Sequence, residues 1–553
     1  MIELRGGTVY DPANGVDGER RDLYLSSEGI VAKPDDPKRV TESIDVSGCV
    51  VMAGAIDIHT HIGGGKVTIA RMMLPEDHLR DLTTRGQHPR LGCGHAAPST
   101  LTTGYRYAEL GYTACFEPAM LPANARQAHM EMADTPIVDK GAYALLGNDD
   151  FLLRMLAKKA DKALIRDYVA WTLKATQALA IKVVNPGGIN AFKFNQRKLD
   201  LDEENSAYGV TPREILIALA EGIQALGLSH PLHIHGCNLG VPGNAETTLA
   251  TIAALDGRPA HLTHIQFHSY GTEGDKHFSS GAAAIAELVN AHRNISVDVG
   301  QVMFGQTVTE SGDSMRQYAG SAFADPKKRV VMDIECDAGC GVVPFKYKDQ
   351  NFVNALQWTI GLEMFLSVRD PWRIFLTTDH PNGAPFTSYP HLIKLLMDRS
   401  FRNDMLGTIS KDAAAATTLG SLDREYSLYE IAIMTRAGPA KTLGLTRLGQ
   451  LGIGARADVV VYNDDPDRER MFGKPRLVYK DGALVAKDGK IVAVPRGATH
   501  VVRPDYDPGI EKQLDQYFDR YMTVKCANLM VGDDEIADGG RGELVIHETA
   551  RGA

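Results

Sequence analysis

Two histidines separated by a single residue, His59 and His61, are the first residues in the chain whose types and spacing predict chemistry. They follow the short apolar run 54–58, which is typical of a β-strand. Because side chains alternate along a strand, both imidazoles point to the same side and could bind one metal ion. Such a pair alone is a weak indication, since histidines are often hydrogen-bonded core residues. The metal hypothesis therefore depends on the polar residues that end other strands.

Lys182 lies in the middle of the apolar run 180–184. An unpaired ammonium buried there would cost several kcal/mol or lose its proton. The structural interpretation is a lysine that extends to the strand end or pairs with a carboxylate. In the functional interpretation, the neutral amine takes up carbon dioxide, and the two oxygens of the carbamate bridge two metal ions. Lys193, in the similar segment 190–194, is the competing candidate.

Two further apolar runs end in histidines. His233 and His235 share one face of a predicted strand, so either could bind a metal. We favour His235, which is nearest the strand end, because His233 could stack inside the core. His264 ends the next apolar run, and His268 follows in the loop, where it could touch a substrate. These histidines would extend the predicted metal site.

Asp379 directly follows the apolar run 374–378. A carboxylate at the end of a strand can bind a metal ion and also move a proton. An aspartate that caps the following helix is the structural alternative. Asp379 is therefore the candidate for both a metal ligand and a proton shuttle.

The elements that must position these residues are short apolar runs alternating with helical stretches. This pattern is typical of a parallel sheet with crossover helices, and eight such units predict an α/β fold, the TIM (β/α)8 barrel. In such a barrel, functional side chains gather at the C-terminal ends of the strands. The predicted strands are 54–58, 112–116, 142–146, 180–184, 231–235, 261–265, 295–299 and 374–378.

The clearest helix signal lies between the fourth and fifth predicted strands. Thr211 is a suitable N-cap, Pro212 suits the first helical position, and Glu214 can complete a capping box. Apolar residues then recur at four-residue spacing until Gly227, which predicts the end of the helix.

The two ends of the chain differ from this central pattern. Residues 1–50 and 437–500 contain short strands and turns, and we expect them to form one composite β-domain. Residues 51–436 would form the barrel, in which the segment 300–373 is too long for a loop and predicts an inserted cap. Residues 501–553 form a polar C-terminal extension with no assigned role.

Composition excludes several classes of protein. With 553 residues, the chain predicts several domains or one large barrel with appendages. Its formal net charge is −10 and no stretch combines basic and aromatic residues, so we expect no nucleic-acid binding. Without a long apolar run or a signal-peptide pattern, we expect a cytoplasmic protein without membrane attachment. Seven cysteines without a CxxC pattern argue against a disulfide framework or an iron–sulfur cluster.

Taken together, these motifs resemble the amidohydrolase superfamily. The resemblance rests on the segment 56–61, the strand-four lysine, the histidines of strands five and six, the strand-eight aspartate and the C-terminal segment 452–460. It implies a TIM barrel with a composite β-sandwich domain, one or two divalent metal ions, and hydrolysis of amide-like bonds.

Three segments, 7–12, 183–188 and 235–240, narrow the resemblance to the alpha subunits of formylmethanofuran dehydrogenases and of bacterial formyltransferase/hydrolase complexes. This implies hydrolysis of the N-formyl group of formylmethanofuran or formylmethylofuran to formate and the free amine. Asp379 would be the catalytic acid/base, and Asn238 and His268 are predicted to contact the substrate. The implied ligands of two zinc ions are His59, His61, carboxylated Lys182, His235, His264 and Asp379.

The same resemblance implies partner subunits: a formyltransferase, a subunit related to molybdopterin enzymes and one related to glutamate synthase. Three alternatives remain open from the sequence. The site could catalyse the reverse condensation of formate with methanofuran, or it could hydrolyse cyclic amides as hydantoinases do. The third alternative is a metal-free scaffold protein without activity.

Overall fold

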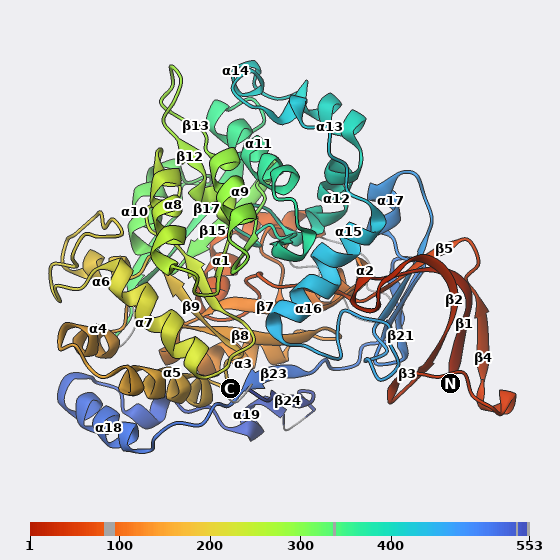
Figure 1. Cartoon of the computed structure of the whole chain (residues 1–553), viewed down its shortest axis with the longest axis horizontal. Helices are drawn as coiled ribbons and strands as arrows, with labels where there is room; N and C mark the ends of the chain where they lie inside the picture. Colours follow the sequence, from red (N-terminus) through yellow and green to blue (C-terminus); the bar gives the residue numbers. More distant parts are fainter. Residues whose placement is uncertain (82–93, 336–338, 538–539, 550–553) are drawn as a thin grey trace.

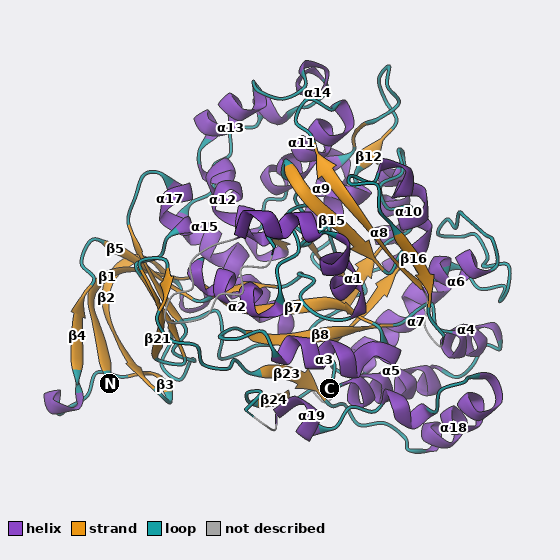
Figure 2. Cartoon of the chain, turned by 180° about the vertical axis from the view of Figure 1, so that it is seen from behind, coloured by secondary structure: helices purple, strands orange, loops and turns teal. Residues whose placement is uncertain are grey.

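The computed structural model describes residues 1–81, 94–335, 339–537 and 540–549. Its centre is a ring of parallel strands surrounded by helices (Figures 1 and 2). In hydrogen-bonded order, the ring consists of β6 (Ala55–Asp57), β7 (Tyr112–Met120), β8 (Asp139–Leu145), β9 (Ala180–Val184), β10 (Leu232–His235), β11 (Ala260–Leu262), β14 (Ile295–Asp298) and β18 (Ile374–Phe375). Each predicted strand overlaps one of these, so the TIM barrel is confirmed.

The ring closes just beyond the ends of its first and last strands. Thr60 forms a parallel bridge with His380, and the backbone N–H of His61 donates to the carbonyl of His380 at 2.7 Å. This closure brings the chain after β6 beside the chain after β18, which matters for the site described below.

Burial explains why these strands appear in the sequence as continuous apolar runs. Every residue of β7, β8 and β9 is buried, because the barrel interior covers one face and the outer helices cover the other. Around this part of the ring, each outer helix packs on the next. The helices in this layer are α5 (Lys162–Thr176), α7 (Pro212–Ala225), α8 (Asn244–Leu255), α9 (Ala282–Ala291) and α11 (Phe352–Ser367).

Helix α7 begins and ends where the sequence predicts. The Thr211 hydroxyl accepts from the backbone N–H of Glu214 at 3.3 Å, and the Glu214 carboxylate accepts from the N–H of Thr211 at 2.8 Å. The helix gives way to Gly227, whose positive φ of 63° suits a residue without a Cβ atom. The capping-box prediction is confirmed.

The two ends of the chain form one continuous, nine-stranded sheet. It is continuous because β5 and β19 pair as antiparallel neighbours, from Cys49 with Asn463 to Ala53 with Val459. Its hydrophobic cluster mixes side chains from both ends of the chain, including Leu4, Leu23 and Tyr479. The strands are β1 (Ile2–Asp11), β2 (Val16–Ser26), β3 (Gly29–Val31), β4 (Glu42–Asp45), β5 (Cys49–Ala53), β19 (Val459–Asn463), β20 (Leu477–Lys480), β21 (Ala483–Lys487) and β22 (Lys490–Ile491).

A small antiparallel sheet covers the barrel between β14 and α11. Its strands are β15 (Gly305–Ser311), β17 (Gly339–Tyr347) and β16 (Val330–Asp333), in that order, and α10 (Ser314–Gly320) packs on them. We call these four elements the cap. They lie within the predicted cap segment, on the side of the barrel where the strands end (Figure 2).

The C-terminal segment lies on the side of the barrel away from the cap (Figure 1). Its strand β23 (Thr499–Val502) extends the barrel sheet beside β8 and pairs with β24 (Leu544–His547). Helix α18 (Gly509–Tyr521) buries Leu514 and Phe518 against the barrel core, and α19 (Asp533–Ala537) packs on α3 (Ala125–Ala133).

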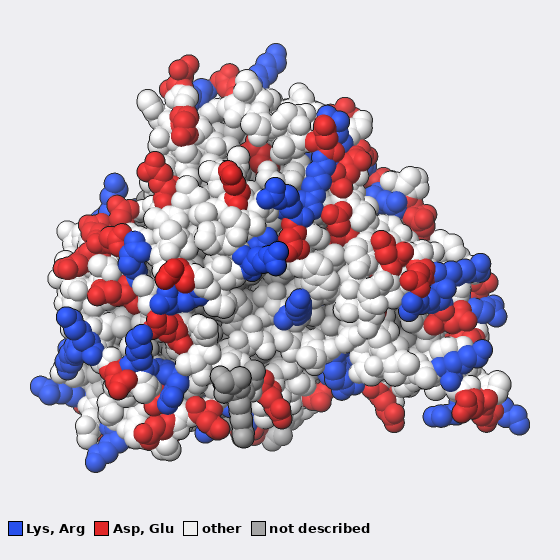
Figure 3. All heavy atoms as spheres, viewed as in Figure 1, with Lys and Arg blue, Asp and Glu red and all other residues white. Residues whose placement is uncertain are grey.

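The surface in Figure 3 carries Lys and Arg side chains mixed with Asp and Glu side chains. No helix among the described residues has the length and apolar character needed to cross a membrane. Neither observation bears on the site, which lies inside the barrel.

A buried charge cluster joins the β-domain to the barrel. The Lys480 ammonium, on β20, lies 3.0 Å from Asp139 on β8 and 2.9 Å from Asp458 just before β19. Although burial opposes the charge, these two carboxylates raise the pKa of Lys480 above its ordinary value. The cluster thus fixes the position of one domain against the other by charge as well as by packing.

We predict that Lys480→Met destabilises the protein by roughly 3–5 kcal/mol, because it leaves Asp139 and Asp458 buried without their cation. The urea concentration at the unfolding midpoint should fall clearly. Lys487→Met removes an exposed charge from the adjacent strand β21 and serves as the control. Equal midpoints for both variants and the unmodified protein would contradict the role of Lys480.

Candidate metal centre and active-site cavity

A cavity of about 300 Å³ lies between the C-terminal ends of the barrel strands and the cap. The barrel contributes His61, Lys182, His235, His264 and Asp379 to its lining, so the structure brings these predicted residues together. Apolar side chains form much of the remaining wall, among them Leu239, Phe267, Phe323, Val343, Phe345 and Tyr347.

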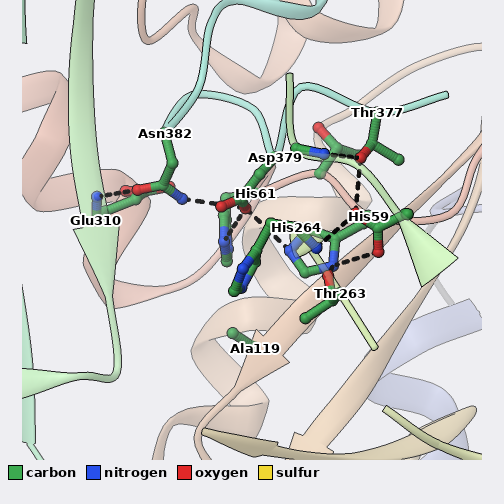
Figure 4. Close-up of polar contacts among 12 residues, drawn as sticks. His59, His61, Ala119, Thr263, His264, Glu310, Thr377, Asp379 and Asn382 are labelled. Carbon is green, nitrogen blue, oxygen red and sulfur yellow. Dashed lines mark hydrogen bonds and ion pairs between the residues drawn. The ribbon is translucent and has the colours of Figure 1, made fainter. Parts of the chain in front are cut away.

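The HxH pair and Asp379 form a compact cluster (Figure 4). Nε2 of His59 lies 2.9 Å from Oδ1 of Asp379, and Nε2 of His61 lies 3.3 Å from the same oxygen. One ligand atom of each residue lies within 4.8 Å of the other two, so the three could hold one metal ion. The cluster forms because the Thr60–His380 bridge sets the two segments side by side.

Glu117 orients His61. Its Oε1 lies 2.9 Å from Nδ1 of His61, while Oε2 accepts the backbone N–H of Ile62 at 2.7 Å. Although burial opposes ionisation, His61 lowers the pKa of the Glu117 carboxyl. A metal-binding histidine usually has a carboxylate on its second nitrogen, which fixes the ring and leaves the first nitrogen for the metal.

A layer of histidines inside the barrel supports His59. Its Nδ1 lies 2.8 Å from Nε2 of His233, and Nδ1 of His233 lies 3.0 Å from Nε2 of His230. The group His59, His233 and Asp298 also has ligand atoms within 4.8 Å. Asp298, however, is hydrogen-bonded to His261 at 3.0 Å, and His233 is bonded on both nitrogens. This layer therefore serves as support beneath the cavity.

His235 and His264 face each other across the cavity floor, with ring centroids 4.6 Å apart. Both side chains are buried, and Nε2 of His235 and Nδ1 of His264 have no hydrogen-bond partner among the described residues. Burial lowers the pKa of both imidazoles, and the lowering at His264 is large. Neutral imidazoles with free lone pairs are suited to a divalent metal such as zinc.

Lys182 lies beside both groups. Its Nζ is 3.5 Å from Nε2 of His59, and burial lowers the pKa of its ammonium to about 8. Lys193, the competing candidate, ends helix α6 (Gly188–Lys193) and pairs with Asp333 of the cap at 2.8 Å. The geometry therefore favours Lys182 as the lysine of the metal site.

The backbone takes unusual conformations at two cavity residues. His264 and Asp379 have φ angles of 36° and 51°, in the left-handed region. Gly300 packs against both: a Cβ atom there would lie 2.3 Å from Cβ of His264 and 3.4 Å from Cβ of Asp379. Strained conformations that the surroundings hold in place are concentrated at functional sites.

The two residues predicted to contact substrate are not among the residues lining the cavity. The side-chain amide of Asn238 is bonded to Asp200 and to the Thr247 hydroxyl. His268 is buried beneath the cavity floor, where its ring stacks on His264 at 5.3 Å. Both side chains therefore support the loops after β10 and β11 in this structure.

Sequence reasoning missed four polar residues near the ligands. Glu117 lies just after the apolar run that predicted β7, so strand continuation was its only signal. Asn382 follows Asp379 by three residues, and its amide donates to Oδ1 of Asp379 at 3.1 Å. Glu310 and Asp313 lie in the cap region, and Oδ2 of Asp313 is 3.5 Å from Nε2 of His235. No local sequence pattern marks either of these two.

The fold and the site define a TIM-barrel protein with a metal-binding centre at the C-terminal ends of its strands. Residues 42–493 match the amidohydrolase family, and the chain belongs to this family. It is 42% identical over 527 residues to FhcA of the formyltransferase/hydrolase complex Fhc of Methylorubrum extorquens, covering 94% of this chain and 95% of that protein. It is 41% identical over 554 residues to the protein FwdA of Methanocaldococcus jannaschii, with 96% of each covered.

A solved structure extends this similarity to three dimensions. The crystal structure of the complex FhcABCD from Methylorubrum extorquens, with methylofuran bound, contains a chain that matches this one with a TM-score of 0.94. The match has 41% identity and covers 99% of both chains. The predicted resemblance is thus confirmed, and the cap and the C-terminal segment are part of the shared fold.

We predict that Lys182→Ala loses most of its bound divalent metal, because the lysine lies at the centre of the ligand cluster. Lys193→Ala should keep the metal content of the unmodified protein. Elemental mass spectrometry after purification without chelator measures both. A metal-replete Lys182→Ala protein would overturn the assignment, and a loss confined to Lys193→Ala would transfer the role to that residue.

We also predict that Glu117→Gln weakens zinc binding by about 10–100-fold, the usual effect of losing a carboxylate behind a ligating histidine. Competition with a chromophoric chelator gives the affinity. Glu246→Gln, an exposed change on α8, should leave the affinity unchanged. Equal zinc affinity in both variants would show that Glu117 does not support His61.

Proposed function

We propose that this chain hydrolyses the N-formyl group of a formylated furan amine, formylmethylofuran or formylmethanofuran, to formate and the free amine. The observation that carries the proposal is the cluster of buried ligands at the cavity floor. It occurs in a chain similar over nearly its full length to FhcA, a protein of a formyltransferase/hydrolase complex. The crystal structure that contains the similar chain also contains methylofuran.

The ligand set fits two divalent ions, which we assign as zinc. The buried nitrogen atoms of His235 and His264 without partners support this assignment. Bound zinc would lower the pKa of a water molecule towards ~7 and polarise the formamide carbonyl. Carboxylated Lys182 would be shared by both ions, one of which His59, His61 and Asp379 would hold, the other His235 and His264.

Asp379 would carry the proton in this reaction. Its Oδ1 is held by Asn382 at 3.1 Å and lies at the entrance of the ligand cluster. From there, the carboxylate can accept the proton of the attacking water and return it to the amine nitrogen. That second step matters because an unprotonated amine is a poor leaving group.

The cavity walls suit a substrate with a flat ring. Phe267, Phe345 and Tyr347 line the cavity above the ligands, and aromatic side chains pack well against a planar ring. The cap also excludes bulk water from the ligand cluster, which strengthens every electrostatic interaction within it.

We further propose that the chain acts within a complex. The similarity to FhcA and to a chain of FhcABCD supports partners of the same kind: a formyltransferase, a protein related to molybdopterin enzymes and one related to glutamate synthase. The similarity to FwdA keeps the reverse reaction, condensation of formate with the amine, as the second direction of the same site.

The test is formate release from formylmethylofuran by the zinc-loaded protein, co-expressed with its partner subunits. We predict that Asp379→Asn lowers kcat at least ~100-fold, as expected for loss of a general acid/base. Metal content is measured in the same samples, so that loss of zinc is distinguished from loss of proton transfer. Near-normal turnover in Asp379→Asn would refute the proton-transfer role.

Other outcomes would identify the alternatives. Turnover of hydantoin or dihydrouracil without formate release from formylmethylofuran would indicate a cyclic-amide hydrolase. A protein that binds its partners but cannot be loaded with metal would be a scaffold.

A further inference from the structure

Glu310, on the first cap strand β15, is a buried carboxylate without a partner. Its side chain is 0% exposed and lines the cavity. Neither of its carboxylate oxygens has a hydrogen-bond partner among the described residues. A buried polar group without a partner is costly and calls for an explanation, and one explanation is a ligand that supplies the missing donor.

Neighbouring cations do not supply that donor. The Lys66 ammonium donates to the carbonyl of Ala119 at 3.1 Å. The Arg71 guanidinium donates to the carbonyl of Ile62 at 2.8 Å and pairs with Glu131 at 3.3 Å. Burial raises the pKa of Glu310 to about 7, although His61 and Lys66 nearby lower it.

The backbone holds Glu310 close to the reaction centre. Its N–H donates to Oδ1 of Asn382 at 2.6 Å, and Nδ2 of the same amide donates to Asp379 at 3.1 Å. Figure 4 shows Asn382 between the two acidic residues. A single side chain therefore fixes the distance between the start of the cap and Asp379.

The proposed reaction needs an acceptor at this position. A secondary formamide presents one carbonyl oxygen and one N–H, and its hydrolysis leaves a primary amine that is a cation at neutral pH. Among the described residues lining the cavity, the only carboxylates are Asp379 and Glu310. Oδ1 of Asp379 already lies within 3.3 Å of His59, His61 and Asn382. Both oxygens of Glu310 remain available for the nitrogen.

We propose that Glu310 recognises the amine end of the substrate: it accepts the formamide N–H and then pairs with the ammonium of the product. This inference rests on the proposed function for the identity of the substrate. It makes the cavity selective for amine derivatives over oxygen analogues, and it orients the nitrogen towards Asp379, which returns the proton.

Arg316 provides a matched control. It also lines the cavity, but on the side of β10, where its guanidinium lies against Gly240. Glu310 lies near His61, which follows β6. Since β6 and β10 are the first and fifth of eight strands, the two charges occupy opposite sides of the barrel.

The experiment compares furfurylamine with furfuryl alcohol as probes of the full-length, zinc-loaded protein, by calorimetry at neutral pH. The unmodified protein should bind the amine at least tenfold more tightly than the alcohol. In Glu310→Gln, this ratio should fall to about one while affinity for the alcohol changes less than about twofold. Arg316→Gln should keep or increase the ratio. An unchanged ratio in Glu310→Gln, or no amine preference in the unmodified protein, overturns the inference.

Metal content and circular dichroism of Glu310→Gln verify that the variant is folded and loaded. Should it fail either check, Glu310→Asp, which keeps the charge but shortens the side chain, replaces it. The shortened carboxylate should reduce the amine preference by at least threefold without altering affinity for the alcohol. A full preference in that variant counts against recognition by Glu310.

A separate assay distinguishes this inference from the proposed function. In formate release from formylmethylofuran, Glu310→Gln should lose inhibition by free methylofuran at least tenfold, while inhibition by formate stays the same. If the unmodified protein releases no formate but keeps its Glu310-dependent preference for furfurylamine, the proposed function fails and amine recognition stands. Unaltered inhibition by methylofuran in an active Glu310→Gln variant overturns amine recognition alone.

Discussion

The exclusion of water from the barrel mouth is the constraint on which the rest of the site depends. His235 and His264 are buried there, and burial lowers the pKa of both, so their lone pairs stay free for a metal. The same burial lowers the pKa of Lys182 to about 8, which increases the share of neutral amine that can react with carbon dioxide. One physical effect thus prepares chemically different ligands for a common pair of metal ions.

Desolvation alone does not set geometry, and the structure adds separate devices for that. Glu117 fixes the ring of His61, and His233 fixes that of His59 from within the barrel. Gly300 lets the chains carrying His264 and Asp379 approach each other closely. Each device comes from a different strand end, and therefore the site exists only when the ring has closed. The bridge between Thr60 and His380 is the contact that completes it.

Much of the fold was predictable because barrel strands are apolar at nearly every position, which gives short, recognisable runs. The choice between His233 and His235 was not predictable from periodicity, since both lie on one face of a strand. The structure separates them by depth: His233 is bonded on both nitrogens, and His235 lines the cavity. Depth along the barrel axis depends on how neighbouring strands align, and local sequence does not encode it. Residues contributed by the cap escaped the sequence for a different reason. Glu310 reaches the cavity through an antiparallel sheet that pairs β15 with the distant strand β17, so nothing near it in sequence reports its surroundings.

Charges that stabilise this protein differ from those that serve its site. Lys480 is as deeply buried as Glu310, yet it lies within 3.1 Å of three carboxylates. A group that exists for structure is paired within the chain, because an unpaired buried charge lowers stability. Glu310 and the open nitrogens of His235 and His264 bear that cost together around one cavity. Their concentration there is best explained by ligands that come from outside the chain, metal ions below and an amine beside them.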